Sequence, residues 1–422
     1  MTGITMGGMI GSGIYVMIGQ VTGYSGPIMW LLFLGSLFYC ITEAMVYVEM
    51  ACMYPNAAST FIYLREGLGA VSPAFAKMYS FAMVWATLLP LGTATLAMSG
   101  AAYVNAFIPV PIVPTAVGLV IICEVMSYIG IGESKNLGNI MTAIELGGVI
   151  MVIIIGAIWG KDQGNNYFMW PVQGLNGVIL SLNLLFFTYA GYEGIGVWSE
   201  ETIDPEKTIP RAALLAILIV GTVYTLMALM ILRLDTWQNI GASGAPVVTA
   251  VVATLGPSMR LVFSFIGFCS IFNTLLFGIV GTATRYYAYA REGIFPKFLL
   301  KLDARTHRPI YAILLNTVAA IGVQFIGSIA FVSQAGTLAG TFNTGVVCIG
   351  LMLLRWKKPD MKRPYKVPGP HSIVNFMVVF CGVISWGVVG LLNVAYWVPY
   401  FGMYGSGAII YWFLVRPREG KF

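Results

Sequence analysis

The sequence predicts an all-α membrane protein with about twelve transmembrane helices, because each helix needs about 20 apolar residues to cross a bilayer. Two observations support this fold class. First, 58% of the 422 residues are hydrophobic and only 9% are charged, whereas soluble domains have about 25% charged residues. Second, two apolar segments are interrupted by glycines, one around residue 11 and the other around residue 191. Interruptions at corresponding places in two halves of a chain are typical of inverted-repeat transporters.

The apolar segments divide the chain into twelve expected spans with short connections. Their bounds are 2–21, 28–51, 72–106, 112–130, 138–159, 175–198, 210–232, 259–289, 309–326, 328–354, 373–393 and 396–415. The first span lacks a basic segment before it, so we expect no cleavable signal peptide. Because only ten residues precede Gly11, we also expect that the sequence is shortened at this end.

The basic residues gather on one side of this arrangement. With the N-terminus in the cytoplasm, 20 of the 23 lysines and arginines, Arg285 among them, are expected in cytoplasmic loops or at the cytoplasmic tail. Positive residues concentrate on the cytoplasmic side of membrane proteins, so we expect a multi-pass protein of the cell membrane with both termini in the cytoplasm. Contact with anionic lipid headgroups explains the net charge of +6, and no nucleic-acid partner is expected.

The first span contains the sequence GGMIGSGIY, from Gly7 to Tyr15. Lipid cannot hydrogen-bond the backbone groups that a break exposes, so a break is tolerated only inside protein or beside a watery cavity. Here Gly11, Ser12 and Gly13 would direct N–H groups into a cavity from the positive end of a half-helix, which suits a carboxylate. The alternative is that these glycines only allow close helix packing.

The sixth span is interrupted by three glycines, and Glu193 lies within the interruption. A charged side chain at the centre of a membrane helix costs roughly 2.5–3.5 kcal/mol. Glu193 is therefore expected to neutralise a cationic group of a substrate or to bind a transported proton, the alternative being that it only holds the unwound segment. The carbonyls around Phe187 and Ala190 would accept hydrogen bonds from an ammonium group. Tyr189 is a candidate aromatic lid, with ordinary packing as its alternative.

Three further carboxylates lie inside apolar spans. Glu145 is expected near the break in the first span, as a proton or cation site, unless its side chain reaches the cytoplasmic water instead. Glu43 and Glu124 have no basic partner in their own spans and are candidates for a proton relay.

The sequence favours neither an enzyme nor a metalloprotein. His307 and His371 fall in cytoplasmic connections, and the carboxylates are scattered one to a span, so no nucleophile, base and orienting group are brought together. We expect no catalytic residues, no metal and no cofactor. The six cysteines lie in or beside apolar spans without metal-type spacing, and we interpret them as packing residues rather than a disulfide framework.

Four stretches together resemble the amino acid–polyamine–organocation superfamily of secondary transporters. They are GGMIGSGIY, YVEMACMYPNAASTFIYLREGLG, FFTYAGYEGIGVWSEETIDPEKTIPRA and ATRYYAYAREGIFP, in this order. The resemblance covers essentially the whole chain. It implies two inverted repeats of five helices each, of the LeuT-like type, at 1–160 and 175–356, followed by two peripheral helices at 372–416.

The resemblance also implies roles for individual residues. The substrate carboxylate would bind at Gly11, Ser12 and Gly13. The substrate amine would be bound by the carbonyls of Met9, Phe187 and Ala190. Tyr189 resembles the aromatic gate of the family.

Two acidic residues bear on which substrate the resemblance implies. Glu193 stands where carriers of cationic amino acids and polyamines often have an acid and where many neutral exchangers have an amide. Glu145 occupies the position at which neutral exchangers commonly have a lysine, which favours a bound cation or proton there.

We therefore expect a secondary active transporter that works by alternating access, through proton-coupled symport or through exchange. The substrate is expected to be an amino acid or related amine, and a cationic amino acid or polyamine is slightly favoured. The alternatives are a neutral amino acid exchanger and, from another class, a membrane sensor that binds substrate without transporting it. The expected partners are the substrate, a proton or counter-substrate and the lipid bilayer, and oligomerisation is left open.

Overall fold

The computed structural model describes residues 2–11, 13–130, 135–367, 371–392 and 394–416, and these residues form helices and connecting loops without a β-strand. Eight helical segments within them are long and apolar enough to cross a membrane, and the first of these, Thr5–Met53, has 49 residues. Shorter apolar helices accompany them, at Ile112–Tyr128, Pro246–Leu255, Ile310–Val323 and Val378–Val388. The expected all-α membrane fold is confirmed, whereas the number of twelve spans stays a prediction.

The helices follow one another along the chain with short connections. The first part contains α1 (Thr2–Met9), a π-helical turn (Gly13–Met17), α2 (Ile18–Ser25), α3 (Met29–Met53), α4 (Thr60–Gly69), α5 (Pro73–Ala86), α6 (Leu91–Asn105), α7 (Ile112–Tyr128) and α8 (Lys135–Ile158). The second part contains α9 (Gly174–Tyr189), α10 (Pro205–Ile231), α11 (Trp237–Ala242), α12 (Pro246–Leu255), α13 (Met259–Arg291), α14 (Ile310–Val323), α15 (Ile329–Lys357), α16 (His371–Leu391) and α17 (Trp397–Ile410).

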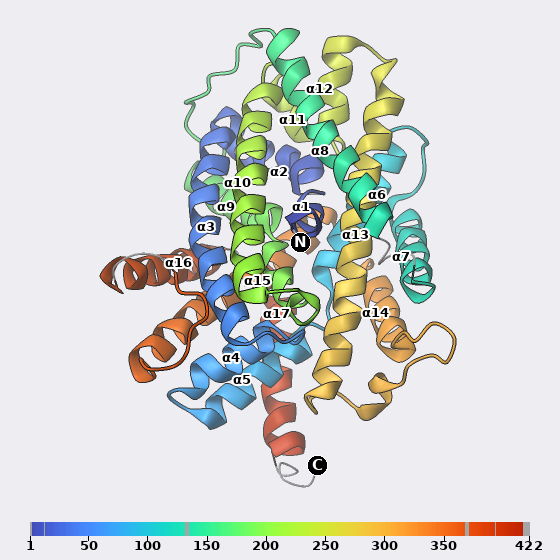
Figure 1. Cartoon of the computed structure of the whole chain (residues 1–422). Helices are drawn as coiled ribbons and strands as arrows, with labels where there is room; N and C mark the ends of the chain where they lie inside the picture. Colours follow the sequence, from blue (N-terminus) through green and yellow to red (C-terminus); the bar gives the residue numbers. More distant parts are fainter. Residues whose placement is uncertain (1, 12, 131–134, 368–370, 393, 417–422) are drawn as a thin grey trace.

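The two interrupted spans lie in the interior of this assembly. Helix α1 packs against α8, α10 and α13, and α9 packs against α2, α3 and α15. In Figure 1, α1 lies near the middle, and the short helices α11 and α12 lie at the end opposite to α4 and α5. The surrounding helices keep the interrupted backbone away from lipid, as unpaired backbone groups require.

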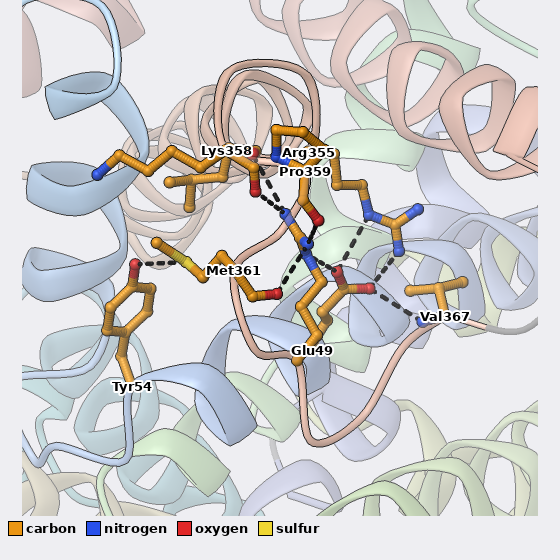
Figure 2. Close-up of polar contacts among 9 residues, drawn as sticks. Glu49, Tyr54, Arg355, Lys358, Pro359, Met361 and Val367 are labelled. Carbon is orange, nitrogen blue, oxygen red and sulfur yellow. Dashed lines mark hydrogen bonds and ion pairs between the residues drawn. The ribbon is translucent and has the colours of Figure 1, made fainter.

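A buried ion cluster lies between α3 and the segment at and after the end of α15 (Figure 2). Glu49 of α3 is fully buried and accepts a hydrogen bond of 3.0 Å from Nε of Arg355, a residue of the last turn of α15. Its other oxygen accepts the N–H of Val367 at 2.9 Å, and Arg363 lies 3.6 Å away. A buried carboxylate needs such partners, since an unpaired one is costly. The cluster thus fixes the segment that follows α15 against α3.

The expected third span is interrupted within its length. Helix α5 ends at Ala86 and α6 begins at Leu91, and Pro90, which cannot donate a backbone hydrogen bond, directly precedes α6. The carbonyl of Thr87 accepts the Tyr286 hydroxyl of α13 at 2.9 Å. This third interruption borders the cavity described below.

Candidate functional site

The break in the first span is held by hydroxyl groups from two neighbouring helices. Helix α1 ends at Met9, and regular hydrogen bonding resumes in the π-helical turn that begins at Gly13. The carbonyl of Met9 accepts the Tyr224 hydroxyl of α10 at 3.0 Å. Thr274 Oγ1 of α13 lies within hydrogen-bonding distance of the carbonyls of Gly7, at 3.2 Å, and Ile10, and its single O–H can donate to one of them at a time. Hydroxyl donors therefore reach the exposed carbonyls where no helix continues, as buried backbone requires.

The break in the sixth span is held by its own carboxylate. Helix α9 ends at Tyr189, and Gly191 has φ +121°, a conformation that glycine adopts without the strain that a side chain would bring. The N–H of Gly191 donates to Oε2 of Glu193 at 2.7 Å. One oxygen of Glu193 thus holds the unwound segment, and the other has no hydrogen-bond partner among the described residues.

The two breaks touch each other. A Cβ atom on Gly191 would lie 2.6 Å from the carbonyl oxygen of Gly8, and one on Gly13 would lie 2.8 Å from Cα of Thr188. The Thr188 hydroxyl also donates to the Gly13 carbonyl at 3.3 Å. At these points the backbones are too close for a methyl group, so the glycines are required by the contact and not only by the breaks.

Two adjoining cavities lie beside the breaks. The smaller has a volume of about 190 Å³ and borders both breaks and α13. The larger, of about 330 Å³, lies among α3, α6, α13 and α15. Both are at or below the lower end of drug-sized sites, which begin near ~300 Å³, so a small metabolite fits them best. The side chains that line both cavities are those of Phe187, Ala190, Glu193 and Arg285.

Five of the expected site residues line these cavities. They are Met9, Gly13, Phe187, Ala190 and Glu193. Gly11 lines neither, because its α-carbon faces Thr274. Ser12 lies outside the described residues.

Tyr189 takes the packing arrangement rather than a place beside the cavities. Its side chain is fully buried, its hydroxyl donates to the Phe33 carbonyl at 3.0 Å, and its ring lies 5.5 Å from that of Tyr224. It lines neither cavity. A role for Tyr189 as a gate stays a prediction.

The three additional carboxylates are buried, each beside a polar partner. Oε1 of Glu145 accepts Asn273 Nδ2 at 2.8 Å, while its Oε2 has no hydrogen-bond partner among the described residues. Because Asn273 precedes Thr274, the same turn of α13 holds Glu145 and caps the first break. Glu43 accepts the Thr344 hydroxyl at 2.6 Å and lines the larger cavity. Glu124 accepts Asn316 Nδ2 at 2.6 Å and lines neither cavity.

Comparison with known proteins decides the family. The model of the amino acid permease family matches residues 1–415. The chain belongs to this family.

The chain is 24% identical over 451 aligned positions to the branched-chain amino acid permease BcaP of Bacillus subtilis (strain 168), covering 100% of this chain and 92% of BcaP. It is 25% identical over 449 positions to the methylthioribose transporter of the same organism, covering 99% and 93%. It is 24% identical over 430 positions to the mouse Asc-type amino acid transporter 1, covering 94% and 78%.

Sequence reasoning missed one cavity-lining residue of the permease. Arg285 was counted among the cytoplasmic basic residues, and the side of the membrane on which it lies stays a prediction. The structure shows that it belongs to α13 and lines both cavities. The helical period could have shown this, because Arg285 follows Thr274 by eleven residues, which is close to three full turns. The two side chains therefore project from the same face of α13.

Beyond the cavities, charged residues join the permease loops at the end of α13. Arg291 forms an ion pair with Glu200, which also accepts the Ala57 N–H at 2.8 Å. The Arg291 guanidinium holds the pKa of Glu200 below its usual range. Arg65 pairs with Glu292 at 3.0 Å. These contacts connect α4 and the loop before it to the end of α13 and to the segment that follows the sixth-span break.

Proposed function

We propose that this permease is a secondary active transporter that moves an amino acid across the cell membrane by alternating access. The observation that carries the proposal is the contact of two interrupted helices beside a cavity bordered by backbone and by one carboxylate. Continuous packed helices would serve a structural role better, since each interruption costs hydrogen bonds in an apolar medium. Membership of the amino acid permease family supports the same conclusion.

The substrate would be bound through its charged groups. Its ammonium group would be accepted by the Ala190 carbonyl and by the oxygen of Glu193 that does not hold Gly191. Its carboxylate would bind the N–H groups at Gly11, Ser12 and Gly13, of which Gly13 lines the smaller cavity. Glycine leaves room for a ligand to approach the backbone closely.

We propose a cationic amino acid or polyamine as the first choice of substrate and a neutral amino acid as the second. Among the described residues, Glu43, Glu193 and Arg285 are the charged side chains that line the larger cavity. Two acids and one base leave a formal excess of one negative charge, which attracts cations in a cavity with low-dielectric walls.

Coupling to a proton or exchange against a second substrate completes the proposal. Glu193 and Glu145 are the candidates for a bound proton or cation. Glu145 supports this role because it is buried, has an unpartnered oxygen and forms no ion pair with a described residue. A buried polar atom without a partner costs free energy, and a transient proton or cation would remove that cost.

The domain division remains part of the proposal. Repeats at 1–160 and 175–356 would each begin with an interrupted helix, which is supported by the breaks after α1 and α9. Residues 372–416 would form two additional peripheral helices. Both termini would lie in the cytoplasm.

Uptake by proteoliposomes tests the proposed function. Purified protein would be tested with radiolabelled lysine, arginine, leucine and putrescine, with and without an inward proton gradient and with unlabelled substrate inside. We expect uptake of an amino acid above that of protein-free liposomes, driven by the gradient or by the internal substrate. Binding without uptake under every condition would favour the sensor instead.

A further inference from the structure

Arg285 has a position that the proposed binding site does not use. Among the described residues it is the one basic side chain that lines either cavity, and it lines both. It is half-buried, in the last third of α13. Its Nη2 donates to Thr282 Oγ1 at 3.0 Å, one turn nearer the centre of the helix. The hydrogen bond to Thr282 thus holds the guanidinium on the side of the cavities. This is toward the N-terminus of α13, the direction in which helical side chains lean.

The guanidinium of Arg285 has unused donors. Arginine carries five N–H groups in a rigid fork, and the Thr282 hydroxyl takes one bond from them. No ion pair joins Arg285 to a described acid, although Glu193 lines the same cavities. Nearby arginines differ, since Arg291 pairs with Glu200 and Arg65 with Glu292.

A free, permanently charged fork beside a small cavity suits a carboxylate. Arginine binds carboxylates with two parallel hydrogen bonds, which are stronger and more specific than single neutral ones. Along the helix, the α-carbon of Arg285 lies about 16 Å beyond that of Thr274, at a rise of about 1.5 Å per residue, and both residues line the smaller cavity. The first break and Arg285 would therefore offer a carboxylate two binding positions along this cavity.

We propose that Arg285 is a carboxylate-binding residue at the junction of the two cavities, so that the protein selects substrates that keep a free carboxylate. This inference rests on the proposed function and narrows it. Amino acids satisfy both Arg285 and Glu193, whereas polyamines satisfy only Glu193. A polyamine is therefore a poor substrate even though the cavities carry more acid than base.

Paired ligands that differ only in the carboxylate test this selection. Lysine and cadaverine form one pair, and leucine and isoamylamine form the other. Purified parent protein and the Arg285→Gln variant would be titrated with each ligand by calorimetry. We expect Arg285→Gln to weaken binding of both amino acids about tenfold, which is about 1.4 kcal/mol. Binding of the amines should be unchanged or tighter, because one positive charge has been removed.

Three further variants make the result decisive. Arg260→Gln removes the same charge from an exposed position at the start of α13 and should change no affinity. Arg285→Lys keeps the charge without the fork, and Thr282→Ala releases the guanidinium; both should weaken amino acid binding less than Arg285→Gln does. If Arg285→Gln does not purify as a monodisperse protein, these two variants carry the test.

Three results would overturn the role of Arg285 alone. They are unchanged amino acid binding in the three cavity variants, an equal loss of binding for amino acids and amines, and a parent protein that binds the amines as tightly as the amino acids. Failure of the parent to bind any amino acid would overturn the proposed function together with this inference.

Discussion

Replacement of Gly191 by alanine tests the contact between the two breaks. The new methyl group would lie 2.6 Å from the Gly8 carbonyl oxygen, on a residue whose φ is +121°. A non-glycine residue in such a conformation costs about 1–3 kcal/mol, and overpacking of a close contact costs about 1–3 kcal/mol. The sum is a destabilisation of roughly 2–6 kcal/mol, unless the two breaks move apart.

Gly194→Ala is the matched control for this substitution. Gly194 lies in the same unwound stretch, has no positive φ, and would place its Cβ more than 4 Å from other atoms. Thermal unfolding of detergent-solubilised protein, monitored by size-exclusion chromatography, would compare both variants with the parent. We expect Gly191→Ala to unfold well below the parent and to lose amino acid binding, and Gly194→Ala to unfold close to the parent. Equal behaviour of the two variants would refute the reasoning, because of these two glycines only Gly191 contacts the other break.

Three other substitutions have defined outcomes. Glu193→Gln keeps an acceptor for the Gly191 N–H but removes the negative charge. Uptake of lysine into proteoliposomes should therefore fall at least about tenfold more than uptake of leucine. An equal loss of uptake for both amino acids would contradict a role of Glu193 in recognition. Thr274→Val removes the hydroxyl donor that the carbonyls of Gly7 and Ile10 share. It should destabilise the protein by about 1–3 kcal/mol in thermal unfolding. An unchanged stability would show that this hydroxyl is dispensable. Glu200→Gln removes the ion pair with Arg291. Because that pair lowers the pKa of Glu200, its stabilisation is complete above the unfolded value of about 4.3 and is lost as the pH falls through the folded value. The difference in stability between the parent and Glu200→Gln should therefore be constant from pH 8 to 6, within the pH range of these assays. A stability difference that becomes smaller between pH 8 and 6 would contradict this role of the ion pair.

Much of the fold could be predicted from the sequence, because bilayer thickness and backbone hydrogen bonding leave a membrane chain few choices. The breaks were predicted at the right places, since glycines and Glu193 are costly in an apolar helix and therefore mark a polar cavity. The interruption before Pro90, between α5 and α6, was not predicted, although a proline within an expected span is a signal for it.

Side-chain direction was harder to predict than the positions of the breaks. Glycines at a break do not show which residues face the cavity: Tyr189 and Gly11 line neither cavity, and their roles stay predictions. Arg285 was counted among the cytoplasmic charges, and a count of charges does not show that its side chain lines a cavity. The partners of Met9 and Glu145 come from α10 and α13, more than a hundred residues away, and the sequence contains no local signal for such contacts.

The central claim is that an amino acid is bound where the two interrupted helices meet. A cryo-electron microscopy map of the protein in lipid nanodiscs, with the amino acid that the uptake panel identifies, tests it most directly. The account predicts ligand density against Gly13, Ala190 and Glu193, with regular helix ending at Met9 and Tyr189. Helices wound continuously through residues 11 and 191, or ligand density only at another place, would contradict it.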